Sequence, residues 1–112
     1  MASSNPLEVA RKAAQGFVLF QCVKCAKAIR KALKAEGHHG EWIVLKPKGK
    51  REFMVCITYD ENTSITQTGI HVGIRVAGKV FDNLHANGLA YEDWVKDFDA
   101  HGGVRILSVD PF

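Results

Sequence analysis

Residues 17–33 have the sequence FVLFQCVKCAKAIRKAL, in which a short apolar run leads into a pair of cysteines. From the first cysteine onwards, basic residues fall on one side of a helical projection and apolar or small residues on the other. This pattern predicts an amphipathic helix that begins at Cys22 and ends near Glu36, with Gly37 as a left-handed cap. Its apolar face consists of Cys22, Cys25, Ala26, Ile29 and Leu33.

The two cysteines have different predicted environments. Cys22 is at the N-terminus of the predicted helix, where unpaired backbone N–H groups and the helix dipole favour a thiolate. Cys25 lies three residues further along, on the predicted buried face. We therefore expect Cys22 to be the reactive thiol and Cys25 to be a core residue.

The composition of the chain is that of a globular protein, and its 112 residues predict a single domain, residues 1–112. The formal net charge of +3 is too small to indicate a nucleic-acid partner. No apolar run approaches the ~20 residues that span a bilayer, and the first residues, MASSNP, lack the pattern of a signal peptide. Three cysteines, an odd number, indicate at least one free thiol and a reducing compartment. We expect a cytoplasmic protein.

Periodicity and turn residues predict the remaining elements. Ser3, Ser4 or Asn5 can cap a first helix that has Pro6 at its first position. The apolar run 17–20 is predicted to be extended or strand-like. Further strands are predicted at 42–45, 53–59, 70–76, 79–83 and 104–109, and a helix at 91–98, with hairpin turns at 47–50 and 77–78. This order predicts an α+β fold with an antiparallel sheet.

A zinc site is one possible role for the cysteine pair, because His38 and His39 follow it in the sequence. A continuous helix from Cys25 places His38 about 20 Å away, however, and zinc–ligand bonds are only ~2.0–2.3 Å long. We therefore expect no metal and no cofactor.

A redox pair is a second possibility. An apolar run followed by Cys22-Val-Lys-Cys25 and a helix is the thioredoxin-like arrangement. The predicted hairpins that follow do not match the strand–helix–strand continuation of that fold, so this remains an alternative.

Nucleophilic catalysis is the third possibility, because His71 begins a predicted strand and can serve a thiol as base. In a hairpin that turns at 77–78, His71 faces Leu84, which places Asp82 diagonally across from His71 on the same face. A turn one residue longer brings Asn83 to that face instead. Either side chain can accept a hydrogen bond from the imidazole and orient it. Nearby, His85 could line the site, whereas Cys56, in the middle of a strand, is expected to be a small buried residue.

Three motifs carry a resemblance to a known family: Gln21-Cys22 with Cys25-Ala26, then the segment 69–73 (GIHVG), then 80–88 (VFDNLHANG). In this order, over about residues 14–100, they resemble the papain-fold toxin domains of bacterial polymorphic toxin systems, specifically the second such family. The resemblance implies a papain-like core of N-terminal helices packed on a small antiparallel sheet, with a further helix near the C-terminus. Carried over, it makes Cys22 the nucleophile, His71 the base and Asn83 the orienting group. Asp82 stays open for the last role. Cys25 stays open for the first, because papain itself uses the second cysteine of its Cys-x-x-Cys.

The resemblance also implies an activity and partners. It predicts a cysteine hydrolase of peptidase or deamidase type that acts as a toxin effector on a protein substrate in a target cell. It further predicts a cognate immunity protein as partner. No membrane or nucleic-acid partner is expected. A papain-like module that only binds a partner, without catalysis, is the remaining alternative.

Overall fold

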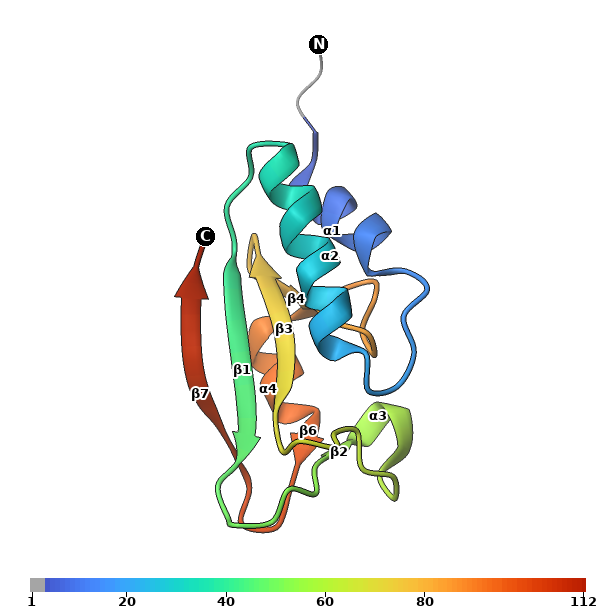
Figure 1. Cartoon of the computed structure of the whole chain (residues 1–112), viewed down its shortest axis with the longest axis vertical. Helices are drawn as coiled ribbons and strands as arrows, with labels where there is room; N and C mark the ends of the chain where they lie inside the picture. Colours follow the sequence, from blue (N-terminus) through green and yellow to red (C-terminus); the bar gives the residue numbers. More distant parts are fainter. Residues whose placement is uncertain (1–3) are drawn as a thin grey trace.

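The computed structural model describes residues 4–112, in which two helices, α1 (Pro6–Ala14) and α2 (Cys22–Ala35), pack together on one face of a sheet (Figure 1). Helix α1 is capped as predicted, since Asn5 Oδ1 accepts a hydrogen bond from Leu7 N at 2.9 Å. Ser3, another candidate cap, lies outside the described residues. Gly37, with φ +77°, ends α2, and His38 N donates to Leu33 O at 2.9 Å. Both helices therefore begin and end close to their predicted residues.

The sheet has five antiparallel strands in the order β5-β4-β3-β1-β7. The predicted α+β class with an antiparallel sheet is confirmed. The strands are β1 (Glu41–Pro47), β3 (His71–Val76), β4 (Lys79–Phe81), β5 (Leu89–Ala90) and β7 (Val104–Pro111).

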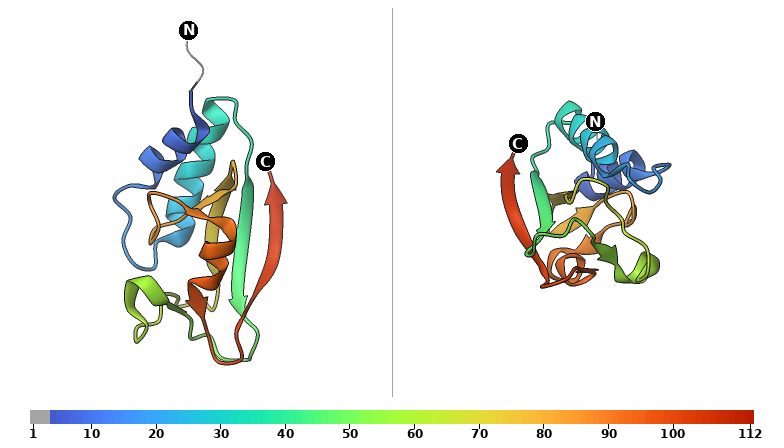
Figure 2. Two further views of the ribbon diagram at one scale, coloured as in Figure 1. Left: turned by 180° about the vertical axis from the view of Figure 1, so that it is seen from behind. Right: turned by 60° about the horizontal axis from the view of Figure 1, so that its bottom comes forward.

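Helix α4 (Tyr91–Lys96) covers the face of the sheet opposite α1 and α2, as the view from behind in Figure 2 shows. Beside it lie a two-stranded sheet of β2 (Val55–Cys56) and β6 (Phe98–Asp99) and the short helix α3 (Ile57–Asp60). Each face thus has its own apolar core. The fully buried residues of the core between the sheet and α2 include Ile29 and Leu33 of α2 and Val72 and Ile74 of β3. Those on the α4 side include Ile43, Leu45, Met54, Val80 and Trp94.

The hairpin predicted between 42–45 and 53–59 is wrong. Strand β1 lies between β3 and β7, whereas Val55 and Cys56 pair with Asp99 and Phe98. Residues 57–60 are helical because this segment is held by Asp97: Ile57 N donates to the Asp97 carbonyl at 2.7 Å. The alternation of apolar residues over 53–59 predicted one strand, but contacts with residues 97–99, which are distant in sequence, determine the structure of this segment.

The hairpin predicted at 77–78 is confirmed. Ala77 and Gly78 have φ of +50° and +82°, and Val76 pairs with Lys79. Positive φ at both central residues is typical of the type I′ turn, which matches the twist of the flanking strands.

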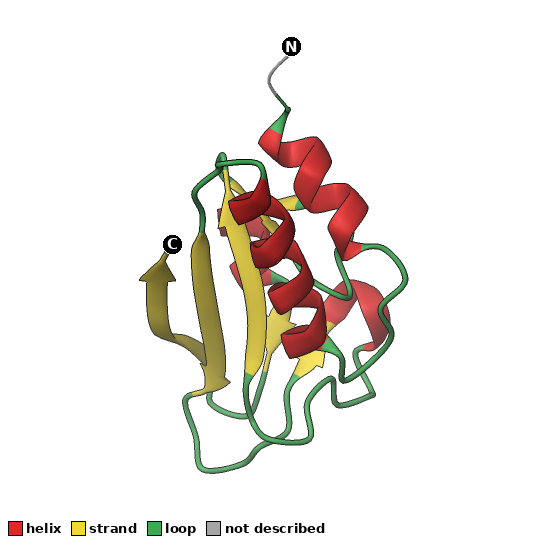
Figure 3. Ribbon diagram, turned by 45° about the horizontal axis from the view of Figure 1, so that its top comes forward, coloured by secondary structure: helices red, strands yellow, loops and turns green. Residues whose placement is uncertain are grey.

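The apolar run 17–20 forms no strand. It is a loop with a turn in which Gln21 N donates to Val18 O at 3.1 Å, and Figure 3 shows the whole α1–α2 connection as loop. Phe20 has φ +68°, in the left-handed region, so the chain reverses direction immediately before α2. The strand of a thioredoxin-like arrangement is therefore missing before Cys22. Among residues 4–112, the structure has no helix whose length and apolar character would let it cross a bilayer.

Candidate active site

His71, the first residue of β3, has a fully buried ring. Its neighbour Val72 faces α2, so alternation along the strand turns His71 towards the α4 side, where its ring centroid lies 4.8 Å from that of Phe98. Nε2 donates to Asp82 Oδ2 at 2.7 Å. Because both side chains are fully buried, water cannot compete for this bond. The imidazole is therefore fixed in one orientation.

Asp82 follows β4 and is the acceptor for five N–H groups. Oδ2 accepts from His71 and from Trp94 Nε1 at 2.8 Å, whereas Oδ1 accepts from Leu84 N at 2.9 Å, from His85 N at 2.6 Å and from His85 Nδ1 at 2.8 Å. Burial raises the pKa of this carboxyl, but the hydrogen bonds from His71 and His85 outweigh burial and hold the pKa far below its ordinary value. Asp82 is thus a buried anion at neutral pH.

Gly73 makes room for the tryptophan that contacts Asp82. A Cβ at position 73 would lie 2.6 Å from Trp94 Cζ2 and 2.7 Å from Val80 Cγ1, both too close for a real contact. The glycine two residues after His71 therefore allows the indole to lie against β3 and to donate to the carboxylate.

Cys22 is the first residue of α2, whose start lies beside the start of β3 (Figure 1). The residue before it, Gln21, makes no side-chain cap, so the first N–H groups of the helix are not capped by it. Burial raises the pKa of the Cys22 thiol, but His71 and the Val72 backbone N–H together lower it by more than burial raises it. The net pKa is below the ordinary value.

His71 shows the matching change. Burial lowers its pKa, but Asp82 and Cys22 outweigh burial and raise the pKa to about 9. Cys22 is close enough to the ring to contribute to this shift, but Nδ1 has no hydrogen-bond partner of ordinary geometry among the described residues. The opposite shifts favour a thiolate–imidazolium pair.

Cys25 is fully buried, and its Sγ lies 3.8 Å from Ala14 O. Burial, with Asp82 and Cys22 nearby, raises its pKa to about 12. The pKa values of the two cysteines in this helical turn are therefore shifted in opposite directions, down for Cys22 and up for Cys25.

Asn83 makes no hydrogen bond to His71. Its Nδ2 donates to Val18 O at 3.0 Å, across to the α1–α2 loop, and its Oδ1 has no hydrogen-bond partner among the described residues. The structure thus brings Cys22, His71 and Asp82 together and places Asn83 beside them, facing the segment that leads into α2.

A cavity of about 120 Å³ opens onto Cys22. No charged side chain lines it, and it lies between the start of α2 and the segment 65–70, which the sequence did not mark as part of a site. The lining residues are Phe20, Cys22, Val23, Ile65, Thr66, Gln67, Thr68 and Ile70.

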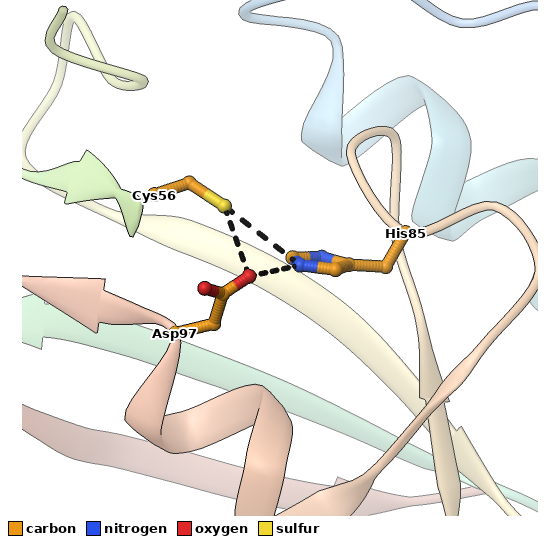
Figure 4. A group of neighbouring side chains, drawn as sticks. All are labelled: Cys56, His85 and Asp97. Atoms are coloured by element: carbon orange, nitrogen blue, oxygen red, sulfur yellow. Dashed lines mark hydrogen bonds and ion pairs between the residues drawn. The ribbon is translucent and has the colours of Figure 1, made fainter. Parts of the chain in front are cut away.

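A second group of side chains lies on the other side of Asp82. Cys56, His85 and Asp97 converge from β2, the loop after β4 and the end of α4 (Figure 4). His85 Nε2 lies 2.6 Å from Asp97 Oδ2 and 3.7 Å from Cys56 Sγ, and Cys56 Sγ lies 3.3 Å from Asp97 Oδ2. Cys56 is buried as expected, but its neighbours are polar.

This group has the residue types that bind zinc, and all three ligand atoms lie within 4.8 Å of one another. Two ligands on a tetrahedral zinc with bonds of ~2.1 Å would be roughly 3.4 Å apart. The 2.6 Å between His85 and Asp97 is instead a hydrogen-bond distance. In this arrangement the three residues form a hydrogen-bonded network.

The sequence did not single out Trp94 as more than a core residue, and it gave Asp97 no role. Trp94 could be recognised only through its partner, because nothing local marks its indole as a donor to Asp82. Asp97 had a usable signal: it lies in the last turn of the predicted helix 91–98, where a carboxylate is unfavourable next to the negative end of the dipole. Such a residue points to a partner elsewhere in the fold.

Comparison with known proteins agrees with this architecture. No curated protein and no solved structure matches the chain. A family model described as "Papain fold toxin 2" matches residues 6–99, which include Cys22, His71 and Asp82. Since this match covers most of the 112 residues, the chain belongs to the papain fold toxin 2 family.

Proposed function

We propose that the chain is a papain-like cysteine hydrolase, with Cys22 as nucleophile, His71 as base and Asp82 as the orienting residue. The observation that carries the proposal is the fully buried His71, whose ring is bonded to Asp82 on one side and interacts with Cys22 on the other. Asn83, which the family resemblance favoured for the third role, would instead support the loop before α2.

The reaction would be acyl transfer. The Cys22 thiolate attacks a carbonyl carbon, His71 donates its proton to the leaving amine as the C–N bond breaks, and a thioester remains. Water, deprotonated by His71, then releases the acid and the free thiol. Proteolysis and side-chain deamidation both follow this scheme. The uncharged cavity beside Cys22 favours a neutral group next to the carbonyl.

An oxyanion would be stabilised at the start of α2, where the Cys22 N–H belongs to the first turn of the helix. Gln67, in the cavity with Cys22, is a candidate second donor. Gln15 is not placed for this role, because its Nε2 donates to Arg11 O of its own helix at 3.0 Å.

Two observations favour a nucleophile over a redox pair. Reversible disulfide chemistry requires both thiols to exchange, yet Cys25 is fully buried and its pKa is raised to about 12. The loop before Cys22 also lacks the strand of a thioredoxin-like fold.

The test is the rate of Cys22 alkylation by iodoacetamide, measured as a function of pH by mass spectrometry. We expect Cys22 to react faster at pH 7 than an ordinary thiol, and His71→Gln to remove most of this difference. Cys25→Ala serves as the control and should leave the rate at Cys22 unchanged. A wild-type profile centred near the ordinary thiol pKa of ~8.5 would refute the pairing.

As a member of a toxin family, the chain would act as an effector in the cytoplasm of a target cell, on a protein substrate, and be neutralised by an immunity protein. Expression in a bacterium should arrest growth, and Cys22→Ala should restore it. If Cys22→Ala is as toxic as the wild type, the chain acts by binding rather than by hydrolysis.

A further inference from the structure

We propose that His85 and Asp97 are positioning residues that set the proton affinity of the Cys22–His71 pair, His85 through its contact with Asp82 and Asp97 through its contact with His85. The inference rests on the proposed function, because it concerns the acidity of the same thiol.

The first step is that one carboxylate is shared by two histidines. Asp82 Oδ2 accepts from His71, and Oδ1 accepts from His85 Nδ1 at 2.8 Å. The bonds on both oxygens prevent the carboxylate from rotating away from His71. Packing alone would not require His85 to direct Nδ1 at Oδ1 of the carboxylate that also binds His71.

The second step is that His85 is itself held from its far side. Its Nε2 donates to Asp97 Oδ2, and Asp97 is fixed by Thr58, whose Oγ1 donates to Oδ2 at 2.5 Å and whose backbone N donates to Oδ1 at 3.1 Å. The result is an unbroken chain of polar contacts, from Thr58 on α3 through Asp97, His85 and Asp82 to His71.

The third step is charge. Burial lowers the pKa of His85, but Asp82, Cys56 and Asp97 raise it to about 11, so His85 is an imidazolium throughout the neutral range. Only the Asp82 carboxylate separates this positive charge from His71. Asp97, which is hydrogen-bonded to the far side of His85, contributes a negative charge at a greater distance. A charge ~8 Å away in a medium of effective dielectric constant ~20 shifts a pKa by on the order of one unit. The titratable groups beside Cys22 and His71 are Cys25 on α2 and Asp82 after β4. Those beside His85 are Asp82, Cys56 on β2 and Asp97 after α4.

The same geometry excludes Cys56 as a second nucleophile served by His85. The nitrogen that would take the thiol proton is Nε2, and it lies closer to Asp97 Oδ2, at 2.6 Å, than to Cys56 Sγ, at 3.7 Å. The group in Figure 4 therefore directs His85 towards Asp82.

Two substitutions of opposite charge test the proposal. His85→Asn retains a donor close to the position of Nδ1 and removes the positive charge, so the Cys22 thiolate is less stabilised. The midpoint of the Cys22 alkylation profile should move up by on the order of one pH unit. Asp97→Asn removes a negative charge at nearly the same shape, and the midpoint should move down. His101→Asn and Asp110→Asn, which change the exposed residues of the same type, are the matched controls and should move the midpoint by less than ~0.2 units.

Opposite shifts support the proposal, because a loss of packing alone would not reverse sign with the charge that is removed. Shifts in the same direction, or none in either variant, would overturn it. If His85→Asn does not fold, as judged by circular dichroism, Asp97→Asn alone must show the downward shift. An ordinary profile in the wild type refutes the proposed function, whereas a shifted wild-type profile that neither substitution changes refutes only this inference.

Discussion

At the scale of single residues, environment rather than residue type separates the two cysteines of one helical turn. Cys22 has a histidine and a backbone N–H beside its sulfur, whereas Cys25 has only the carbonyl of Ala14 at 3.8 Å. A thiolate is stabilised by donors, and the site of Cys25 offers none of comparable strength. The pKa values of the two thiols therefore shift in opposite directions because the two side chains point to different surroundings from the first turn of α2.

Substitution of Cys25 by serine should lower stability without affecting the reactive thiol. The shorter C–O bond leaves a hydroxyl buried with an acceptor out of reach, which costs about 1–3 kcal/mol of the free energy of unfolding. Urea denaturation measures this loss, and iodoacetamide labelling of Cys22 should be unchanged. A large fall in the labelling rate would mean that Cys25 takes part in the reaction.

Gly73→Ala tests the close approach of Trp94 to β3. The new Cβ would lie 2.6 Å from the indole, so the ring must shift and the bond from Nε1 to Asp82 must lengthen. We expect a loss of about 1–3 kcal/mol in the free energy of unfolding, as for other overpacked cores, and a change in tryptophan fluorescence. An unchanged emission spectrum with unchanged stability would show that the indole has room to move.

At the scale of elements, the β3–β4 hairpin holds both ends of the His71–Asp82 bond. Ala77 occupies a left-handed conformation, φ +50°, that costs a non-glycine residue about 1 kcal/mol, whereas asparagine is preferred there. Ala77→Asn, followed by the existing Gly78, should therefore raise the free energy of unfolding by about 0.5–1 kcal/mol in urea titrations. Destabilisation by Ala77→Asn would mean that the turn is held by contacts other than its own backbone preference.

This hairpin could be predicted from sequence because its two strands are separated by only two residues. A two-residue turn at 77–78 predicted Asp82 on the same face as His71, and a turn one residue longer predicted Asn83 there. The structure has the two-residue turn and the hydrogen bond between His71 and Asp82. The family resemblance favoured Asn83, whose catalytic role stays a prediction, since its side chain makes no hydrogen bond to His71. The partners of β1 and β2 could not be predicted, since β1 pairs with β7 and β2 with β6, more than forty residues further along the chain. Periodicity carries no information on such pairings, so the group of Cys56, His85 and Asp97 was also unpredictable.

At the scale of the whole molecule, the site joins the two faces of the sheet. Cys22 comes from the helical face, and Asp97 and Trp94 come from the α4 face. His71 and Asp82, at the ends of two neighbouring strands, connect them. Since His71 and His85 keep their protons to a higher pH in the folded state than in the unfolded chain, global stability is linked to the protonation of the site.

The free energy of unfolding should therefore fall as the pH rises from 7 to 9. In the unfolded chain both histidines titrate near 6.5, whereas in the folded protein the pKa of His71 is about 9 and that of His85 about 11. The stabilisation that comes from these raised pKa values is fully present below pH 6.5 and decreases as the pH rises above 6.5. The raised pKa of His71 and the lowered pKa of Cys22 act on the slope in opposite directions, whereas the raised pKa of His85 has no such counterpart, so His85 contributes most of the slope. One proton corresponds to about 1.4 kcal/mol per pH unit, measurable by urea denaturation at pH 7, 8 and 9 under reducing conditions. His85→Asn should flatten this dependence and His101→Asn should not; a wild-type stability that is constant or rises across this range would show that His85 is not protonated in the folded protein.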